Sequence, residues 1–111
     1  MSSSLNARPR LRVPSSARAG EVIEIRTLIE HPMQTGLNED ARGQRQPRDM
    51  LARFVATANG ADVFTVDFGN GTSANPALTF YARVDETTEF SFVWHHEDGR
   101  SVTATAEVTV G

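Results

Sequence analysis

The stretch that decides the fold runs from residue 90 to residue 110 and reads FSFVWHHEDGRSVTATAEVTV. Apolar side chains recur at every second position on both sides of Asp98-Gly99, a spacing that predicts β-strands. One face carries Phe90, Phe92, Trp94 and His96 before the turn, and Val102, Ala104, Ala106, Val108 and Val110 after it. Because Asp-Gly is a preferred tight-turn pair, the stretch predicts an antiparallel hairpin with one buried face.

The same alternation continues upstream. Ile23, Ile25, Thr27 and Ile29 share the face expected to point inward in a strand over residues 21–31. Further strands are expected at residues 10–13, 50–59, 63–68 and 78–84, with Asn59-Gly60 as a second hairpin turn. The Ala-rich segment 50–59 would also permit a helix. Seven short strands predict an all-β fold, an immunoglobulin-like antiparallel β-sandwich, and a barrel stays open.

The 111 residues fit one domain, which we expect to span residues 10–111 after a flexible N-terminal tail at residues 1–9. No Cys is present, which excludes disulfides, a thiol nucleophile and thiolate metal ligands. All basic residues are Arg, and the formal net charge of -3 gives no electrostatic footprint for nucleic acid. No run approaches a membrane span, and the N-terminus lacks an apolar signal-peptide core, so composition alone predicts a cytoplasmic protein.

Two loops interrupt the strand pattern. Residues 31–48 form a long polar stretch with two Pro and two Gly, and residues 69–76 read GNGTSANP. Loops as long as the first are uncommon in compact domains and are more often functional than accidental. The long loop is therefore the first place to look for binding.

Three chemical readings compete for the polar residues. A metal site would need His31 to reach His95 or His96, which point to opposite faces of their strand, together with carboxylates that no spacing predicts. A small hydrolase is the second reading, but no nucleophile elbow, zinc-protease motif or phosphate loop is present. The third is a ligand platform on Phe90, Phe92 and Trp94, residues that at strand spacing more often form core.

A non-catalytic module that binds another protein remains. Val22 and Leu28 on the outer strand face, with Met33 and Leu37 in the long loop, are apolar residues that a partner would bury. Scattered exposed apolar residues are also ordinary, and the sequence pattern alone leaves this choice open.

The stretches GEVIEIRTLIEHPMQTG, SANPALTFYARV and EFSFVWHHEDG, followed by a Val/Thr-rich final strand, strongly resemble the SoxZ family. The resemblance extends from about Arg10 to Val110 in the same order, and the HPM-x-TG and SANP elements are its most specific parts. SoxZ is the cysteine-free subunit of the thiosulfate-oxidation carrier SoxYZ.

This resemblance implies a non-enzymatic scaffold with no cofactor. Its heterodimer partner would be SoxY, whose C-terminal Cys arm carries the sulfur intermediate while other Sox enzymes make transient contacts. The expected location is the periplasm, by co-export with SoxY, which replaces the cytoplasmic expectation. No nucleic acid or membrane partner is implied, and the isolated chain could self-associate. The candidate partner-binding residues are His31, Pro32, Met33, Thr35, Gly36, Leu37, Ser73, Asn75 and Pro76.

Overall fold

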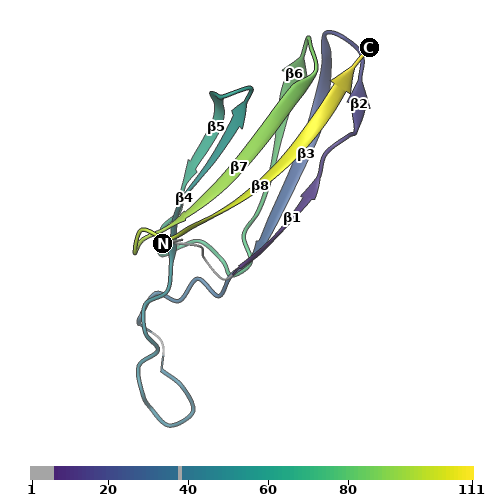
Figure 1. The fold of residues 1–111 in the computed structure, drawn as a ribbon. Coiled ribbons are helices and arrows are strands. Elements are labelled where there is room, and N and C mark those ends of the chain that lie inside the picture. The colour runs from purple at the N-terminus through teal and green to yellow at the C-terminus, as the bar shows by residue number, and fades with distance from the viewer. Residues whose placement is uncertain (1–6, 38) are drawn as a thin grey trace.

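The computed structural model describes residues 7–37 and 39–111, and these residues form strands and loops without a helix (Figure 1). The strands are β1 (Arg8–Arg12), β2 (Ser16–Ala17), β3 (Glu21–Glu30), β4 (Leu51–Ala58), β5 (Ala61–Asp67), β6 (Ala77–Val84), β7 (Thr88–His96) and β8 (Ser101–Val110). They build a three-stranded sheet in the order β1-β3-β6 and a five-stranded sheet in the order β2-β8-β7-β4-β5. All strand pairs are antiparallel except β2 with β8. The predicted all-β sandwich is confirmed.

The core lies between the inner faces of the two sheets. Alternate residues of β3 are buried, as the spacing predicted, and they meet the aromatic inner face of β4 and β7. Phe54, Phe92 and Trp94 are fully buried, with the Phe54 ring 5.0 Å from Trp94 and 6.2 Å from Phe92 between centroids. The aromatic stripe of β7 is therefore core, and it is not a ligand platform.

The structure departs from the sequence expectation in three strands. Segment 50–59 is the strand β4, so the helix alternative is wrong, but a register shift between Leu51 and Arg53 lets both Met50 and Leu51 be fully buried. A two-residue strand, β2, had no signal in the sequence. β1 begins at Arg8, two residues before the expected domain start and within the expected tail at residues 1–9, of which residues 1–6 lie outside the described residues.

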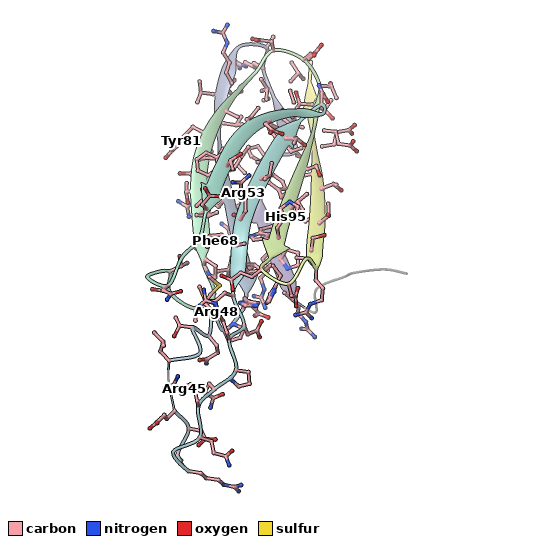
Figure 2. The ribbon with its side chains drawn as sticks, turned by 90° about the vertical axis from the view of Figure 1, so that its left-hand side faces the viewer. Arg45, Arg48, Arg53, Phe68, Tyr81 and His95 are labelled. Carbon is pink, nitrogen blue, oxygen red and sulfur yellow. The ribbon has the colours of Figure 1, made fainter. Side chains whose placement is uncertain are left out.

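The long loop between β3 and β4 projects away from the end of the sandwich (Figure 1). Its tip is folded on itself: the backbone N–H groups of Arg42 and Gln44 both donate to Asp40 Oδ1 at 2.9 Å, and Gly43 adopts a φ of 79°. Figure 2 shows Arg45 on this projection and Arg48 where it joins the sandwich. No helix able to span a membrane occurs among the described residues.

Candidate functional site

The two family-specific motifs lie against each other at the end of the sandwich from which the long loop projects. The backbone N–H of Asn75 donates to the carbonyl of His31 at 2.7 Å, and the His31 N–H donates to Asn75 Oδ1 at 2.8 Å. Asn75 adopts a φ of 53°, a conformation that Asn tolerates better than most residues. The HPM and SANP elements are thus one structural unit although they are 44 residues apart.

Two residues of the HPM-x-TG element have left-handed backbone conformations. Met33, at a φ of 51°, turns its N–H back onto His31 Nδ1 at 3.0 Å and places its side chain in the core. Gly36 has a φ of 85°, and a Cβ atom there would lie 3.2 Å from Cβ of Arg48. The motif therefore turns the backbone sharply at the start of the long loop and brings it close to the end of that loop.

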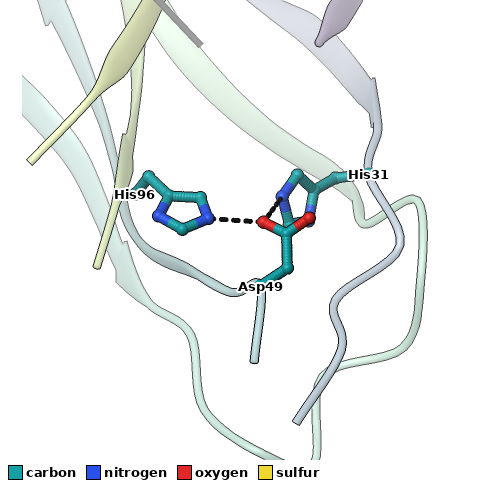
Figure 3. A group of neighbouring side chains, drawn as sticks. All are labelled: His31, Asp49 and His96. Atoms are coloured by element: carbon teal, nitrogen blue, oxygen red, sulfur yellow. Dashed lines mark hydrogen bonds and ion pairs between the residues drawn. The ribbon is translucent and has the colours of Figure 1, made fainter. Parts of the chain in front are cut away.

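A cluster of three ionisable side chains closes the base of this loop. His31 follows β3, Asp49 precedes β4, and His96 ends β7 (Figure 3). Asp49 Oδ1 lies 3.1 Å from Nε2 of His31 and 2.6 Å from Nε2 of His96. Both rings are buried, while the Asp49 side chain is 42% exposed. Among the described residues this is the one group of three or more His, Cys, Asp or Glu placed to share an ion.

The hydrogen bonds define the protonation of His31. Its Nδ1 faces the Met33 N–H, which can only donate, so Nδ1 must accept and the ring proton sits on Nε2. The Nε2–H then donates to Asp49, and both nitrogens of His31 are used. His96 is similar at Nε2, which lies 2.6 Å from Asp49 Oδ1, but its Nδ1 has both a donor and an acceptor beside it: the Asp98 N–H at 3.1 Å and Asp98 Oδ1 at 3.0 Å.

The electrostatics agree with a neutral His31 and an ionised Asp49. Burial lowers the pKa of His31 below its ordinary value, and it outweighs the opposing attraction of Asp49. Burial by itself would raise the pKa of Asp49, but the hydrogen bonds with His96 and His31 and the electrostatic attraction of the two rings lower it overall. The cluster therefore consists of a partly buried Asp49 carboxylate that accepts hydrogen bonds from two imidazole N–H groups.

This geometry argues against His31 as a metal ligand and as a general base. A metal on Nε2 of His31 would require the ring proton to move to Nδ1, where it would face the Met33 N–H. His96 and Asp49 alone would leave two ligands, fewer than the three protein ligands of an ordinary catalytic zinc site. Because His31 has no nitrogen with a lone pair free, it cannot accept a proton from a substrate.

Part of this cluster was expected from the sequence, which offered a site where His31 meets His95 or His96. In the structure His31 meets His96, with ring centroids 5.5 Å apart. His95 points to the opposite, exposed face, as alternation requires (Figure 2). Asp49 was missed, because a carboxylate at the end of an irregular loop has no periodic signal.

Arg48, next to Asp49 in the chain, makes a second set of contacts at the base of the long loop. Its Nε and one terminal nitrogen each donate to Glu97 at 2.8 Å, which makes a bidentate pair. The guanidinium also donates to the carbonyl of Thr35 at 2.9 Å and to Asn70 Oδ1 at 3.0 Å. Arg48 therefore joins both ends of the long loop to the β5–β6 loop and the β7–β8 turn.

The nine candidate partner-binding residues divide by exposure. His31, Met33 and Pro76 are buried within this chain, and Thr35 and Gly36 are half-buried. Pro32, Leu37, Ser73 and Asn75 are exposed, with Leu37 at 67% of its full accessible area. The buried members shape the two loops, and the exposed members remain available to a partner.

Comparison with known proteins places the chain in a family and a fold. The family model described as "Sulphur oxidation protein SoxZ" matches residues 11–107. No curated protein sequence matches the chain. Among solved structures, the sulfur carrier protein SoxY from Chlorobium limicola f thiosulfatophilum is similar with a TM-score of 0.65 and 14% identity, covering 93% of this chain and 78% of SoxY.

Two superoxide reductases have the same fold. Superoxide reductase (neelaredoxin) from Ignicoccus hospitalis gives a TM-score of 0.69 at 18% identity, over 93% of this chain and 80% of that protein. A putative superoxide reductase from Thermotoga maritima gives 0.67 at 11% identity, over 93% and 85%. Identities this low show a shared fold and carry no activity to this chain. The family match over residues 11–107, with the fold that it shares with SoxY, shows that this chain belongs to the SoxZ family of sulfur-oxidation proteins.

Proposed function

We propose that this chain is the non-catalytic subunit of a sulfur carrier, and that it binds SoxY, which supplies the thiol that holds the sulfur intermediate. The observation that carries the proposal is the family match over residues 11–107 in a chain without Cys. A protein that lacks a thiol cannot hold a sulfur intermediate as a mixed disulfide or persulfide. The thiol must come from a partner.

The cluster His31–Asp49–His96 supports the non-catalytic role. It is the strongest concentration of chemistry-bearing side chains among the described residues, and its hydrogen bonds occupy both nitrogens of His31. The cluster therefore serves to hold the base of the long loop.

The long loop supports the partner-binding role. Its base is held by Arg48 and Asp49, while Leu37 and the folded tip at residues 39–46 extend into solvent. A loop with a fixed base loses less conformational entropy on binding than a free one, so it is suited to docking. We place the contact with SoxY or its mobile arm on Pro32, Leu37, Ser73 and the edges of the neighbouring loops.

The test is co-expression with SoxY from the same organism. We expect a stable heterodimer on size exclusion, and sulfur-compound turnover in a reconstituted Sox system only when both subunits are present. Leu37→Asp should weaken the heterodimer, and Val63→Asp, which changes another exposed apolar side chain, on β5 away from the loop, is the control. Turnover of a sulfur compound by the isolated chain would overturn the non-catalytic role.

The proposed location is the periplasm, reached by export together with SoxY. Cell fractionation with and without the signal sequence of SoxY tests this. The chain should move to the cytoplasmic fraction when SoxY loses its signal, and periplasmic recovery without SoxY would contradict co-export.

A further inference from the structure

Strand β8 has a partner on only one side for most of its length. β7 pairs with it from Ser101 to Val108, whereas β2 pairs only with Thr109 and Val110. Within the part of the chain that the structure describes, the second edge of residues 101–108 therefore has no strand partner. Alternate N–H and C=O groups along such an edge are available to an added strand.

The β1 edge of the three-stranded sheet carries features that discourage strand addition. β1 contains Pro9, which has no N–H, and its outer residues are Arg8, Arg10 and Arg12. Residues 101–108 contain no Pro and no basic residue, and Glu107 is their one charge. The β8 edge thus lacks the protection that sheet edges usually have.

The side chains next to this edge are apolar and incompletely covered. Val102, Ala104 and Ala106 point toward the core but are half-buried, and Leu11 of β1, the strand that lies against β8, is half-buried as well. Because the Ala side chains are small, they cover little of the core at this margin of the sandwich. A strand added to β8 would bury these atoms with its own alternate apolar residues.

Two neighbouring carboxylates on the outer face of the sheet favour a positively charged side chain on any strand added to β8. Glu89 of β7 lies directly opposite Glu107 of β8, and both are exposed. Like charges at opposing positions of a sheet are unfavourable, and neither forms an ion pair with the described residues. A basic side chain on a neighbouring strand would relieve this repulsion.

We propose that SoxY contributes a β-strand to the β8 edge of this chain, with apolar residues over Val102, Ala104 and Ala106 and a basic residue near Glu107. The inference rests on the proposed function and names the surface through which it acts. Solved SoxY has the same sandwich fold, so it has sheet edges that can supply such a strand. Strand addition provides affinity through main-chain hydrogen bonds and specificity through alternate side chains.

The test is amide hydrogen exchange on the chain alone and in complex with SoxY. The amides of residues 101–108 that point away from β7 should exchange faster in the free chain and become at least roughly tenfold slower in the complex, because an added strand accepts their hydrogen bonds. A complex that forms without new protection in this segment would overturn the inference and leave the proposed function standing. Absence of any complex would overturn both.

A charge reversal separates binding from folding. Glu107→Arg should raise the melting temperature of the isolated chain, because it replaces the Glu89–Glu107 repulsion with an attraction, and should weaken the SoxY complex by roughly tenfold. Asp62→Arg is the matched control, since Asp62 is an exposed acid on β5 at the far edge of the same sheet. Equal weakening by both variants would show a general charge effect and contradict the β8 location.

Two other occupants give distinct results. Concentration-dependent protection of residues 101–108 in the isolated chain would indicate a second copy. Protection that disappears when residues 1–6 are deleted would indicate the chain's own N-terminus. If SoxY adds no protection beyond either of these, the proposed strand partner is wrong.

Discussion

At the scale of single residues, the site depends on how hydrogen-bond donors and acceptors are matched. Asp49 Oδ1 accepts from two buried imidazoles, and the Nδ1 atom of each ring lies within 3.1 Å of a backbone N–H two residues further along. The rings are oriented from both sides, so the three segments that meet at the loop base are fixed relative to one another. These hydrogen bonds therefore hold the start of the long loop, its end and the end of β7 together.

Asp49→Ala should destabilise the chain by about 1–3 kcal/mol, because it leaves buried imidazole N–H groups without an acceptor. Chemical denaturation monitored by Trp94 fluorescence measures the change. His95→Ala, which removes an exposed imidazole next to the cluster, should change stability by less than about 0.5 kcal/mol. Equal losses for the two variants would show that the Asp49 contacts contribute nothing specific.

Zinc should not raise the melting temperature of the chain, because His31 cannot offer a lone pair on Nε2 while its Nδ1 accepts the Met33 N–H. Thermal melts with and without zinc at neutral pH measure this. Saturable binding that His31→Ala and His96→Ala abolish, and that His95→Ala leaves intact, would establish a metal site and reverse this interpretation.

At the scale of strands and loops, the alternation of apolar and polar residues predicts which residues of a regular strand are buried, but it fails where a strand is irregular. β3 and β7 bury every second residue, so their core residues could be read from the sequence. β4 has a register shift that buries the neighbouring residues Met50 and Leu51, and no period-2 pattern contains such a step.

Phe92→Ala should cost about 3–5 kcal/mol, since Phe92 is fully buried between aromatic neighbours of both sheets. Urea denaturation gives the free energy of unfolding. Tyr81→Ala removes an aromatic ring that is 65% exposed and should cost far less. A small loss at Phe92 would mean that the two sheets do not pack as described.

Arg48→Ala should loosen the long loop with little effect on the global melting temperature, because Arg48 joins four segments through exposed contacts. Limited proteolysis and amide exchange over residues 39–46 should both become faster. Arg53→Ala removes another surface ion pair, the one with Asp67 on the sheet, and should leave the loop unchanged. Unchanged loop exchange in Arg48→Ala would refute the role of Arg48 at the loop base.

At the scale of the whole molecule, the long loop projects from one end of the sandwich (Figure 1), and the side chains of His31, Asp49 and His96 meet at its base. The contacts proposed for SoxY at the loop end and at the β8 edge lie on two separate surfaces of the domain.

The stability of the whole chain should fall as the solution is acidified. The pKa of His31 is lower in the folded state than the ordinary value of 6.5, so between these two values the unfolded chain binds more protons and stability rises with pH. The pKa of Asp49 is also lowered, which adds a second loss of stability below its ordinary value of 3.8.

Melting temperatures measured from about pH 4.5 to 8 test the first step. The slope that begins near pH 6.5 should be reduced in His31→Gln, whatever the absolute stability of that variant, and kept in His95→Gln. A His31→Gln slope equal to that of the parent chain would assign the pH dependence to other groups.

The sequence by itself determined the fold class, most strand positions, the buried face of each strand and the family. Strand alternation and short motifs depend only on residues that are close together in the chain. Only the tertiary structure decided which polar residues meet. Asp49 reaches His31 and His96 because three segments distant in sequence converge at one end of the sandwich. The open edge of β8 likewise depends on strand order, which local spacing does not encode, because pairing is chosen by the packing of the whole core.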